Sequence, residues 1–235
     1  MSKKKLLSLA LVVIMVALLS FSTLAWFTDN ETVTNEFMIA NSEDDTADEI
    51  FSVDVWEDRN NDGNPDNDLT GEDEEGLQYK DVLPGDVLPK VVNIQNTGYY
   101  DQYIRITVTV SDAAAWMTVL NTNGRVPYLN EIVDGFDPAD TWADTTAVYD
   151  DVKDEIVYTA YYRNILNGAV ENDYDNNPNN LNVVTVFEAV KIPASMTQEQ
   201  AVAFEHNFFI TVMAEAVQTE NVGATAQEAF ATIEG

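Results

Sequence analysis

The sequence predicts a mainly β protein, an antiparallel β-sandwich with short helical insertions, and three observations lead to that fold class. Several segments alternate apolar and polar residues with a period of two, the pattern of strands that bury one face. No long segment has the 3.6-residue period of an amphipathic helix. The loops between the alternating segments are rich in Asp, Asn, Gly and Pro. Jelly-roll and immunoglobulin-like topologies both satisfy this pattern.

At least seven segments have the alternation of a strand. The clearest is Tyr103 to Ser111, whose aliphatic residues at even positions share one face while Arg105, Thr107 and Thr109 take the other. The other segments, in chain order, are Val33-Phe37-Ile39, Phe51-Val53-Val55, Val92-Ile94, Ile156-Tyr158-Ala160-Tyr162, Val184-Val186 with Val190-Ile192, and Phe208-Ile210-Val212-Ala214-Ala216. We expect the first of them to belong to an N-terminal strand segment, residues 26–40, and the others to form one domain over residues 41–235.

Helices and turns are predicted only in short stretches. Three segments favour a helix: Asp112 to Leu120, Ser195 to His206 with a Ser-x-x-Gln capping box, and Thr225 to Ile233. Pro84-Gly85 predicts a tight turn, and Asn96-Thr97-Gly98 predicts a second one. We therefore expect residues 82–110 to form a hairpin.

Residues 1–25 have the features of a secretory signal peptide. Three lysines precede an apolar run from Leu6 to Leu19, and Thr23-Leu24-Ala25 supplies the small residues of a cleavage site. The alternative is an uncleaved membrane anchor, because Leu6 to Leu24 is nearly long enough to span a bilayer. We expect cleavage after Ala25, and hence a secreted protein of the extracellular matrix or cell surface with no stable membrane span.

The chain is strongly acidic and contains no cysteine. Cleavage after Ala25 would leave 8 Lys+Arg against 41 Asp+Glu, a net charge of −33. Nucleic acid and anionic lipids are therefore poor partners, whereas divalent cations and basic surfaces are suitable ones. Solubility alone is the simpler explanation of the charge. Without cysteine there is neither a disulfide scaffold nor thiolate chemistry.

An acidic loop, residues 57–76, contains the segment that most resembles a metal site. Its oxygen-bearing side chains alternate, and a glycine allows a sharp turn after the third; the candidate ligands are Asp58, Asn60, Asp62, Asn64 through its carbonyl, Asp66 and Asp68. This is the spacing of a loop that wraps around calcium. However, Leu69 occupies the position of the usual bidentate glutamate. The loop is thus either a structural calcium site or a solvated acidic loop.

An enzymatic function has little support. His206 is the single histidine, so a His-Glu-x-x-His zinc site cannot form. A Ser-His-Asp triad is assembled in space and stays open, but His206 between a helix and a strand is more often a packing residue. We expect no catalytic site and no cofactor other than structural calcium.

Three blocks of the sequence resemble the TasA/camelysin family of secreted Gram-positive proteins. They are the signal followed by "TLAWFTDNETVTNEF", the block "LPGDVLPKVVNIQNTGYYDQYIRI", and "FFITVMAEAVQTENVGATAQEAF" near the end. The resemblance implies a jelly-roll sandwich, processing by a dedicated signal peptidase, and head-to-tail polymerisation into fibres of the biofilm matrix. It also allows contacts with other matrix proteins. Unlike TasA, this chain has the acidic loop and lacks a lysine-rich tail.

In such a fibre the N-terminal strand of one subunit completes a sheet of the next. The resemblance assigns that donor role to residues 26–40, and the segment is patterned for it. Its candidate interaction residues are Trp26, Phe27, Val33, Phe37 and Ile39, of which all but Trp26 share one parity. The same segment can also fold back onto its own sandwich as an ordinary first strand.

Two other functions compete with the matrix fibre. One is a monomeric, calcium-stabilised binding module of the cell surface, which recognises ligands through its loops. The other, weaker one is a camelysin-like metalloprotease. Deletion of the donor segment separates the first two, because only in the binding module does the segment belong to the protein's own core.

Overall fold

The fold was derived from a computed structural model, which describes residues 28–33, 52–58, 79, 82–98, 100–168, 182–202, 204, 208–220 and 222–234. Its elements follow in chain order. They are β1 (Thr28–Val33), β2 (Val53–Asp58), β3 (Val87–Asn96), β4 (Gln102–Ser111), α2 (Ala113–Val119), α3 (Leu129–Ile132), β5 (Val133–Asp134), β6 (Trp142–Asp150), β7 (Glu155–Tyr162), β8 (Val183–Lys191), α4 (Gln198–Val202), β9 (Ile210–Gln218) and α5 (Ala226–Glu234).

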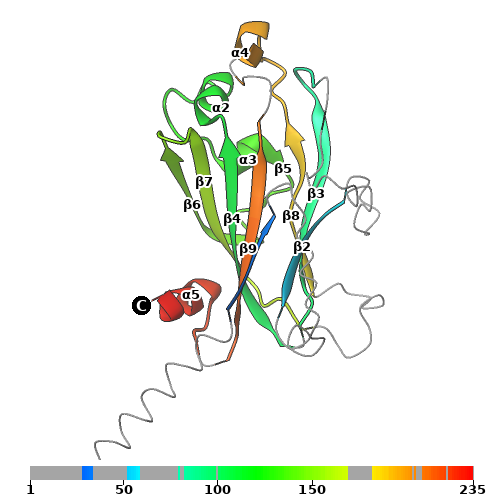
Figure 1. The fold of residues 1–235 in the computed structure, drawn as a ribbon, viewed down its shortest axis with the longest axis vertical. Coiled ribbons are helices and arrows are strands. Elements are labelled where there is room, and N and C mark those ends of the chain that lie inside the picture. Colours follow the sequence, from blue (N-terminus) through cyan, green and yellow to red (C-terminus); the bar gives the residue numbers. More distant parts are fainter. Residues whose placement is uncertain are drawn as a thin grey trace, which may run out of the picture.

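The strands form two antiparallel sheets that pack face to face (Figure 1). One sheet has the order β1-β9-β4-β7-β6, and the other has the order β2-β3-β8-β5. Their inner faces share one hydrophobic core, to which Val108 and Ile156 contribute from the first sheet and Val92 and Val186 from the second. The predicted fold class, a mainly β antiparallel sandwich with short helices, is confirmed.

The predicted strands correspond to β2, β3, β4, β7, β8 and β9. In β4 the even positions Ile104 to Val110 are buried and the odd positions are half-buried, as the alternation predicts. β6 was missed because it is an edge strand whose residues from Asp144 to Val148 are all exposed. Without a buried face it has no apolar period. β5 and α3 are too short to produce a pattern.

The three predicted helices correspond to α2, α4 and α5. As expected, Trp116 of α2 is buried, and Leu120 just beyond it packs against the same core. In α4 the capping box lies two residues later than predicted. The Thr197 N–H donates to Gln200 Oε1 at 2.8 Å, and the Gln200 N–H donates to Thr197 Oγ1 at 3.2 Å. Thr197, rather than Ser195, therefore caps this helix.

Both turns of residues 82–98 are confirmed. The Asp86 N–H donates to the Leu83 carbonyl at 3.1 Å, and Gly85 between them has a φ of +92°, which suits glycine at this position of a tight turn. In the second turn the Gly98 N–H donates to Asn96 Oδ1 at 2.9 Å.

The hairpin predicted for residues 82–110 is wrong, because β3 and β4 lie in different sheets. The chain changes sheets at Asn96, which is fully buried. Asn96 Nδ2 donates to the carbonyls of Tyr100 at 2.8 Å and Leu166 at 3.0 Å. These two bonds, with the Gly98 contact, hold the chain at the corner where it passes from one sheet to the other. The sequence pattern indicated a turn at this point but not that the next strand joins the other sheet.

Candidate functional site: the N-terminal edge of the five-stranded sheet

The N-terminal strand β1 lies at the edge of the five-stranded sheet and pairs with β9 of its own chain. The pairing is antiparallel over the whole of β1, from Thr28 opposite Val217 to Val33 opposite Val212. β1 lies beside β9 in Figure 1, with β2 of the other sheet next to it, and it contacts both. The segment thus occupies the seam where the two sheets meet.

The sequence of β1 is poor in apolar residues for a strand at a core. "TDNETV" contains two acids and a single aliphatic residue, Val33. Its partner strand β9 is richer in buried apolar residues, since Val212, Ala214 and Ala216 are all buried. Main-chain hydrogen bonds, rather than apolar burial, are therefore the main contribution that β1 can make to stability.

Only one of the predicted subunit-interaction residues is described by the structure. Val33 ends β1 and lies opposite Val212. The remaining four, Trp26, Phe27, Phe37 and Ile39, lie outside the described residues. The predicted cleavage site after Ala25 also lies outside the described residues.

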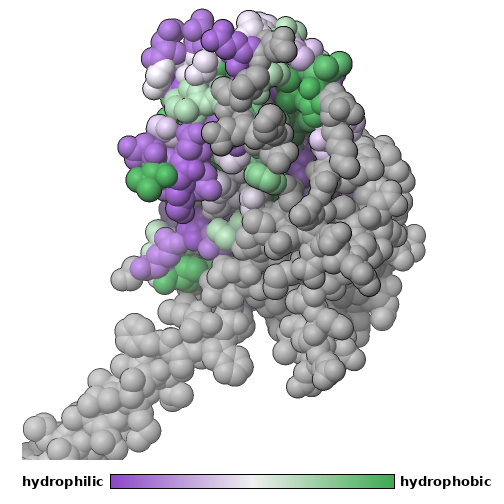
Figure 2. Space-filling view, turned by 45° about the horizontal axis from the view of Figure 1, so that its top comes forward, coloured by the Kyte–Doolittle hydropathy of each residue, from purple (hydrophilic) through white to green (hydrophobic). Residues whose placement is uncertain are grey.

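The opposite edge of this sheet, β6, has the features of a protected edge. The register with β7 shifts between Ala143 and Thr146, and Asp144 there has a φ of +49°. Such bulges and charges hinder the addition of a further strand. Figure 2 shows mostly hydrophilic residues, with isolated hydrophobic ones, on the side of the molecule where β6 lies. Of the two edges, the one that β1 occupies is better suited to accept a strand.

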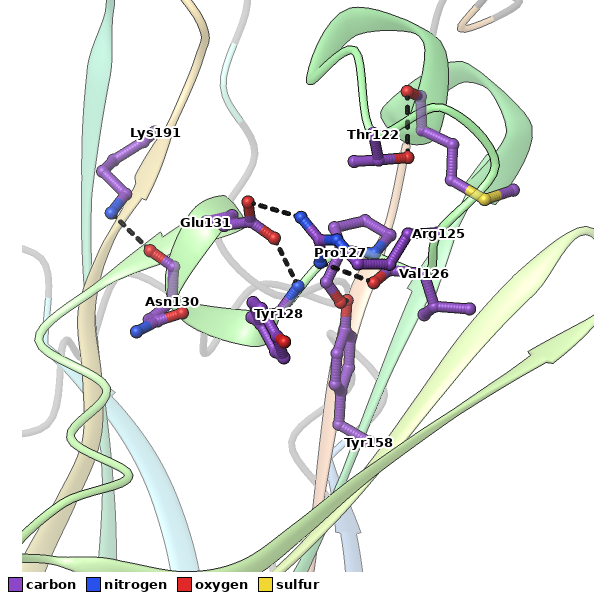
Figure 3. Close-up of polar contacts among 10 residues, drawn as sticks. Thr122, Arg125, Val126, Pro127, Tyr128, Asn130, Glu131, Tyr158 and Lys191 are labelled. Carbon is purple, nitrogen blue, oxygen red and sulfur yellow. Dashed lines mark hydrogen bonds and ion pairs between the residues drawn. The ribbon is translucent and has the colours of Figure 1, made fainter.

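The two sheets are tied together away from β1 by residues 120–132, the loop that joins α2 to β5 and includes α3 (Figure 3). Tyr158 of β7 donates its hydroxyl to the Pro127 carbonyl at 2.9 Å, and Lys191 of β8 donates to the Asn130 carbonyl at 2.7 Å. The loop is thereby bonded to one strand of each sheet. Burial raises the pKa of the Tyr158 hydroxyl above its usual range, so it stays protonated as a donor.

An ion pair braces this loop from within. Arg125 donates to Glu131 Oε1 at 2.8 Å and lies over the Tyr128 ring, and the Tyr128 N–H donates to Glu131 Oε2 at 2.6 Å (Figure 3). The hydrogen bond from Arg125 lowers the pKa of Glu131 below its usual range. The tie between the sheets is therefore preorganised and independent of β1.

The C-terminal helix α5 packs on the outer face of the five-stranded sheet. Arg105 of β4 donates two hydrogen bonds to Glu215 of β9 and a third to Glu234 of α5, and its guanidinium lies 4.4 Å from the centre of the Phe230 ring. Burial lowers the pKa of Arg105, but the hydrogen bonds to Glu215 and Glu234 outweigh it and raise the pKa above its usual range. Sequence reasoning missed this cluster, because Arg105 and Glu215 lie 110 residues apart.

Of the candidate calcium ligands, only Asp58 is described. It ends β2 with 1% of its surface exposed, and the adjacent Glu57 forms a buried ion pair with Lys90 of β3. The other five, Asn60, Asp62, Asn64, Asp66 and Asp68, lie outside the described residues, as does His206. Within the described ranges, no three His, Cys, Asp or Glu side chains are grouped so as to hold a metal ion.

Comparisons with protein-family models, curated proteins and solved structures gave no match. In the part of the chain that the structure describes, no helix is long and apolar enough to cross a membrane.

Proposed function

We propose that this chain is a secreted structural protein of an extracellular biofilm matrix, which polymerises into fibres by exchanging its N-terminal strand between subunits. The observation that carries the proposal is the position of β1, a polar strand at a sheet edge, paired with β9 alone in its sheet. Removal of β1 exposes the edge of β9 and leaves the pairing among β9, β4, β7 and β6 intact. The resemblance to the TasA/camelysin family is a second, independent support.

The pairing of β1 within its own chain is the starting point of the exchange. Residues 34–52 join β1 to β2, and a segment of that length reaches at most about 65 Å when extended. β1 can therefore leave β9 and still reach a neighbouring molecule. In the neighbour it would meet an identical edge, so the same hydrogen bonds form between subunits as within one.

The acceptor must remain folded while its edge is open. The ties from Tyr158 and Lys191 to the loop between α2 and β5 support this, because they join the sheets without β1. The exposed apolar surface would consist of Val212, Ala214 and Ala216 of β9 together with β2, and an incoming strand would cover it again. Since each subunit would donate its N-terminal strand and accept another at the edge of β9, the contact is head-to-tail and generates an open filament.

A disulfide that pins β1 to its own β9 tests the proposal. Thr32 and Met213 are direct partners in the register, and the chain has no cysteine of its own. The mature chain, from Trp26, is prepared with both positions as cysteine and oxidised at low concentration as monomer. We expect the oxidised protein to stay monomeric under conditions in which the reduced form gives filaments by electron microscopy. The single variants Thr32→Cys and Met213→Cys control for the substitutions.

Filament growth by the oxidised, internally crosslinked monomer would contradict the proposal. Deletion of residues 26–39 then separates it from the alternative, a monomeric surface-binding module. A fibre protein should give a folded but non-polymerising sandwich, because β1 contributes few apolar groups. A binding module whose first strand belongs to its core should lose its cooperative unfolding transition.

A further inference from the structure

The outer face of the five-stranded sheet contains an uncharged area between α5 and the β6–β7 turn. In β4, β7 and β9 the residues that point away from the core in this area form two rows across the strands. One row contains Met213, Thr107 and Thr159, and the next contains Thr211, Thr109 and Val157. We call these six residues the threonine face. β6 extends both rows at its end of the sheet, with Thr146 opposite Thr159 and Val148 opposite Val157.

The six residues of the threonine face carry no charge, although the chain as a whole is strongly acidic, with 41 Asp+Glu against 11 Lys+Arg. Charged side chains begin again directly beyond the two rows. On one side Arg105 pairs with Glu215, and on the other Glu155 lies opposite Asp150. The face is therefore a neutral area with a charged border.

Another part of the same outer face is strongly apolar, and a helix covers it. There Tyr103 and Val217 pack against Phe230, and α5 covers them. Among the residues that the structure describes, no helix covers the threonine face, and its six residues are all half-buried, as outward positions of an open sheet are. It consists of β-branched side chains and one methionine, which pack well against another flat surface.

We infer that the threonine face is the surface through which two copies of this chain meet side by side. A mature subunit with a net charge of −33 repels its copies wherever two acidic surfaces approach. A neutral face avoids this repulsion and allows two sheets to approach to the separation of about 10 Å at which side chains of stacked sheets interdigitate.

The size of the face sets the strength of this contact. With the positions by which β6 extends it, the threonine face spans four strands about 4.8 Å apart and two rows about 7 Å apart, which gives on the order of 300 Å² per subunit, well below the roughly 800 Å² of a stable interface. A single contact is therefore weak. Along a filament it repeats with every subunit, and the repeated contacts add up to a strong association. The inference thus rests on the proposed function for its consequence, which is the bundling of filaments.

Site-directed crosslinking tests the face without requiring filaments. In the mature chain, Thr107→Cys places one thiol in the face, and Val152→Cys places one at the β6–β7 turn, where the native side chain is 90% exposed. Each variant is treated as concentrated monomer with a short bismaleimide, and labelling by a monofunctional maleimide corrects for reactivity. We expect several-fold more crosslinked dimer from Thr107→Cys than from Val152→Cys. Equal or greater dimer formation by Val152→Cys would overturn the inference.

Electron microscopy of charged variants tests the consequence. Thr107→Asp and Thr109→Lys should each give single filaments where the unmodified chain gives bundles, while Val152→Asp should leave bundles intact. Bundles of normal width in both face variants would overturn the inference. If the unmodified chain gives no filaments at all, the proposed function fails, whereas the crosslinking comparison still decides whether the threonine face is a contact between copies.

Discussion

Arg105 and Glu215 lie side by side on β4 and β9 and form a two-point ion pair, with Nε to Oε2 at 2.6 Å and Nη2 to Oε1 at 2.9 Å. The pair joins the two strands next to the seam and also anchors α5 through Glu234. Because planar guanidinium and carboxylate groups match in this geometry, lysine cannot replace the arginine equally well.

Replacement of Arg105 by methionine should destabilise the protein by about 1–3 kcal/mol, because Glu215 loses its hydrogen bonds and α5 loses its anchor. Urea unfolding followed by circular dichroism measures the change. Arg163→Met is the matched control, since the exposed Arg163 side chain donates to the Pro138 carbonyl and forms no ion pair with a described residue. Equal destabilisation by the two variants would show that the ion pair contributes nothing specific.

The corner at Asn96 gives a second prediction. Asn96→Leu removes two donated bonds and one accepted bond at a fully buried position, and leaves the Leu166 carbonyl without that donor. A loss of about 2–4 kcal/mol in the free energy of unfolding is expected. Asn130→Leu, at an exposed position, should change stability by less than about 0.5 kcal/mol. Stability close to that of the native chain in Asn96→Leu would mean that the corner is held by its neighbours alone.

The pairing of Arg125 with Glu131 predicts a specific dependence on pH. The pKa of Glu131 is lowered in the folded state, so its contribution is fully present above its ordinary value of 4.5. It is lost as the pH falls through the lower folded pKa. The stability difference between the native chain and Arg125→Met should therefore be constant near neutral pH and shrink in this acidic window. Urea unfolding at a series of pH values measures it, and a difference that stays constant down to pH 3 would rule the pairing out as its source.

The calcium hypothesis for the acidic loop predicts a ligand-dependent thermal shift. Calcium should raise the unfolding temperature of the mature chain, and a chelator should reverse the effect, because a ligand that binds only the folded state stabilises it. The double variant Asp62→Asn with Asp66→Asn should abolish the shift, whereas Asp150→Asn with Asp151→Asn at the β6–β7 turn should preserve it. An equal shift in both double variants would identify general screening of charge instead of a bound ion.

Assembly itself should depend on ionic conditions. If residues 1–25 are removed as proposed, each subunit has a net charge of −33, and raised salt, lowered pH or calcium should promote filament formation by reducing repulsion. Light scattering and negative-stain microscopy across these conditions measure it. Persistent monomers in all of them would count against the matrix function.

The alternation of buried and exposed residues predicted the central strands well, since β4, β7 and β9 have one face in the core. It failed at β6, whose residues from Asp144 to Val148 are exposed on both faces, and at Asn96, where the signal for a turn does not say which sheet the next strand joins. The donor role of residues 26–40 stays a prediction from the family resemblance, and the pairing of residues 28–33 with β9 of the same chain could not be read from their sequence. Contacts between distant residues, such as Arg105 with Glu215, leave no spacing in the sequence to detect.

The chain's first described strand and its last helix lie at the same end of the sandwich, because Thr28 is opposite Val217 and Val217 packs under α5 (Figure 1). The turn at Val152 lies at the other end, since β7 begins opposite Ser111. If strands are exchanged as proposed, a fluorescent reporter attached beside α5 would lie where an incoming strand has to enter. The same reporter inserted at Val152 would lie at the far end of the sandwich.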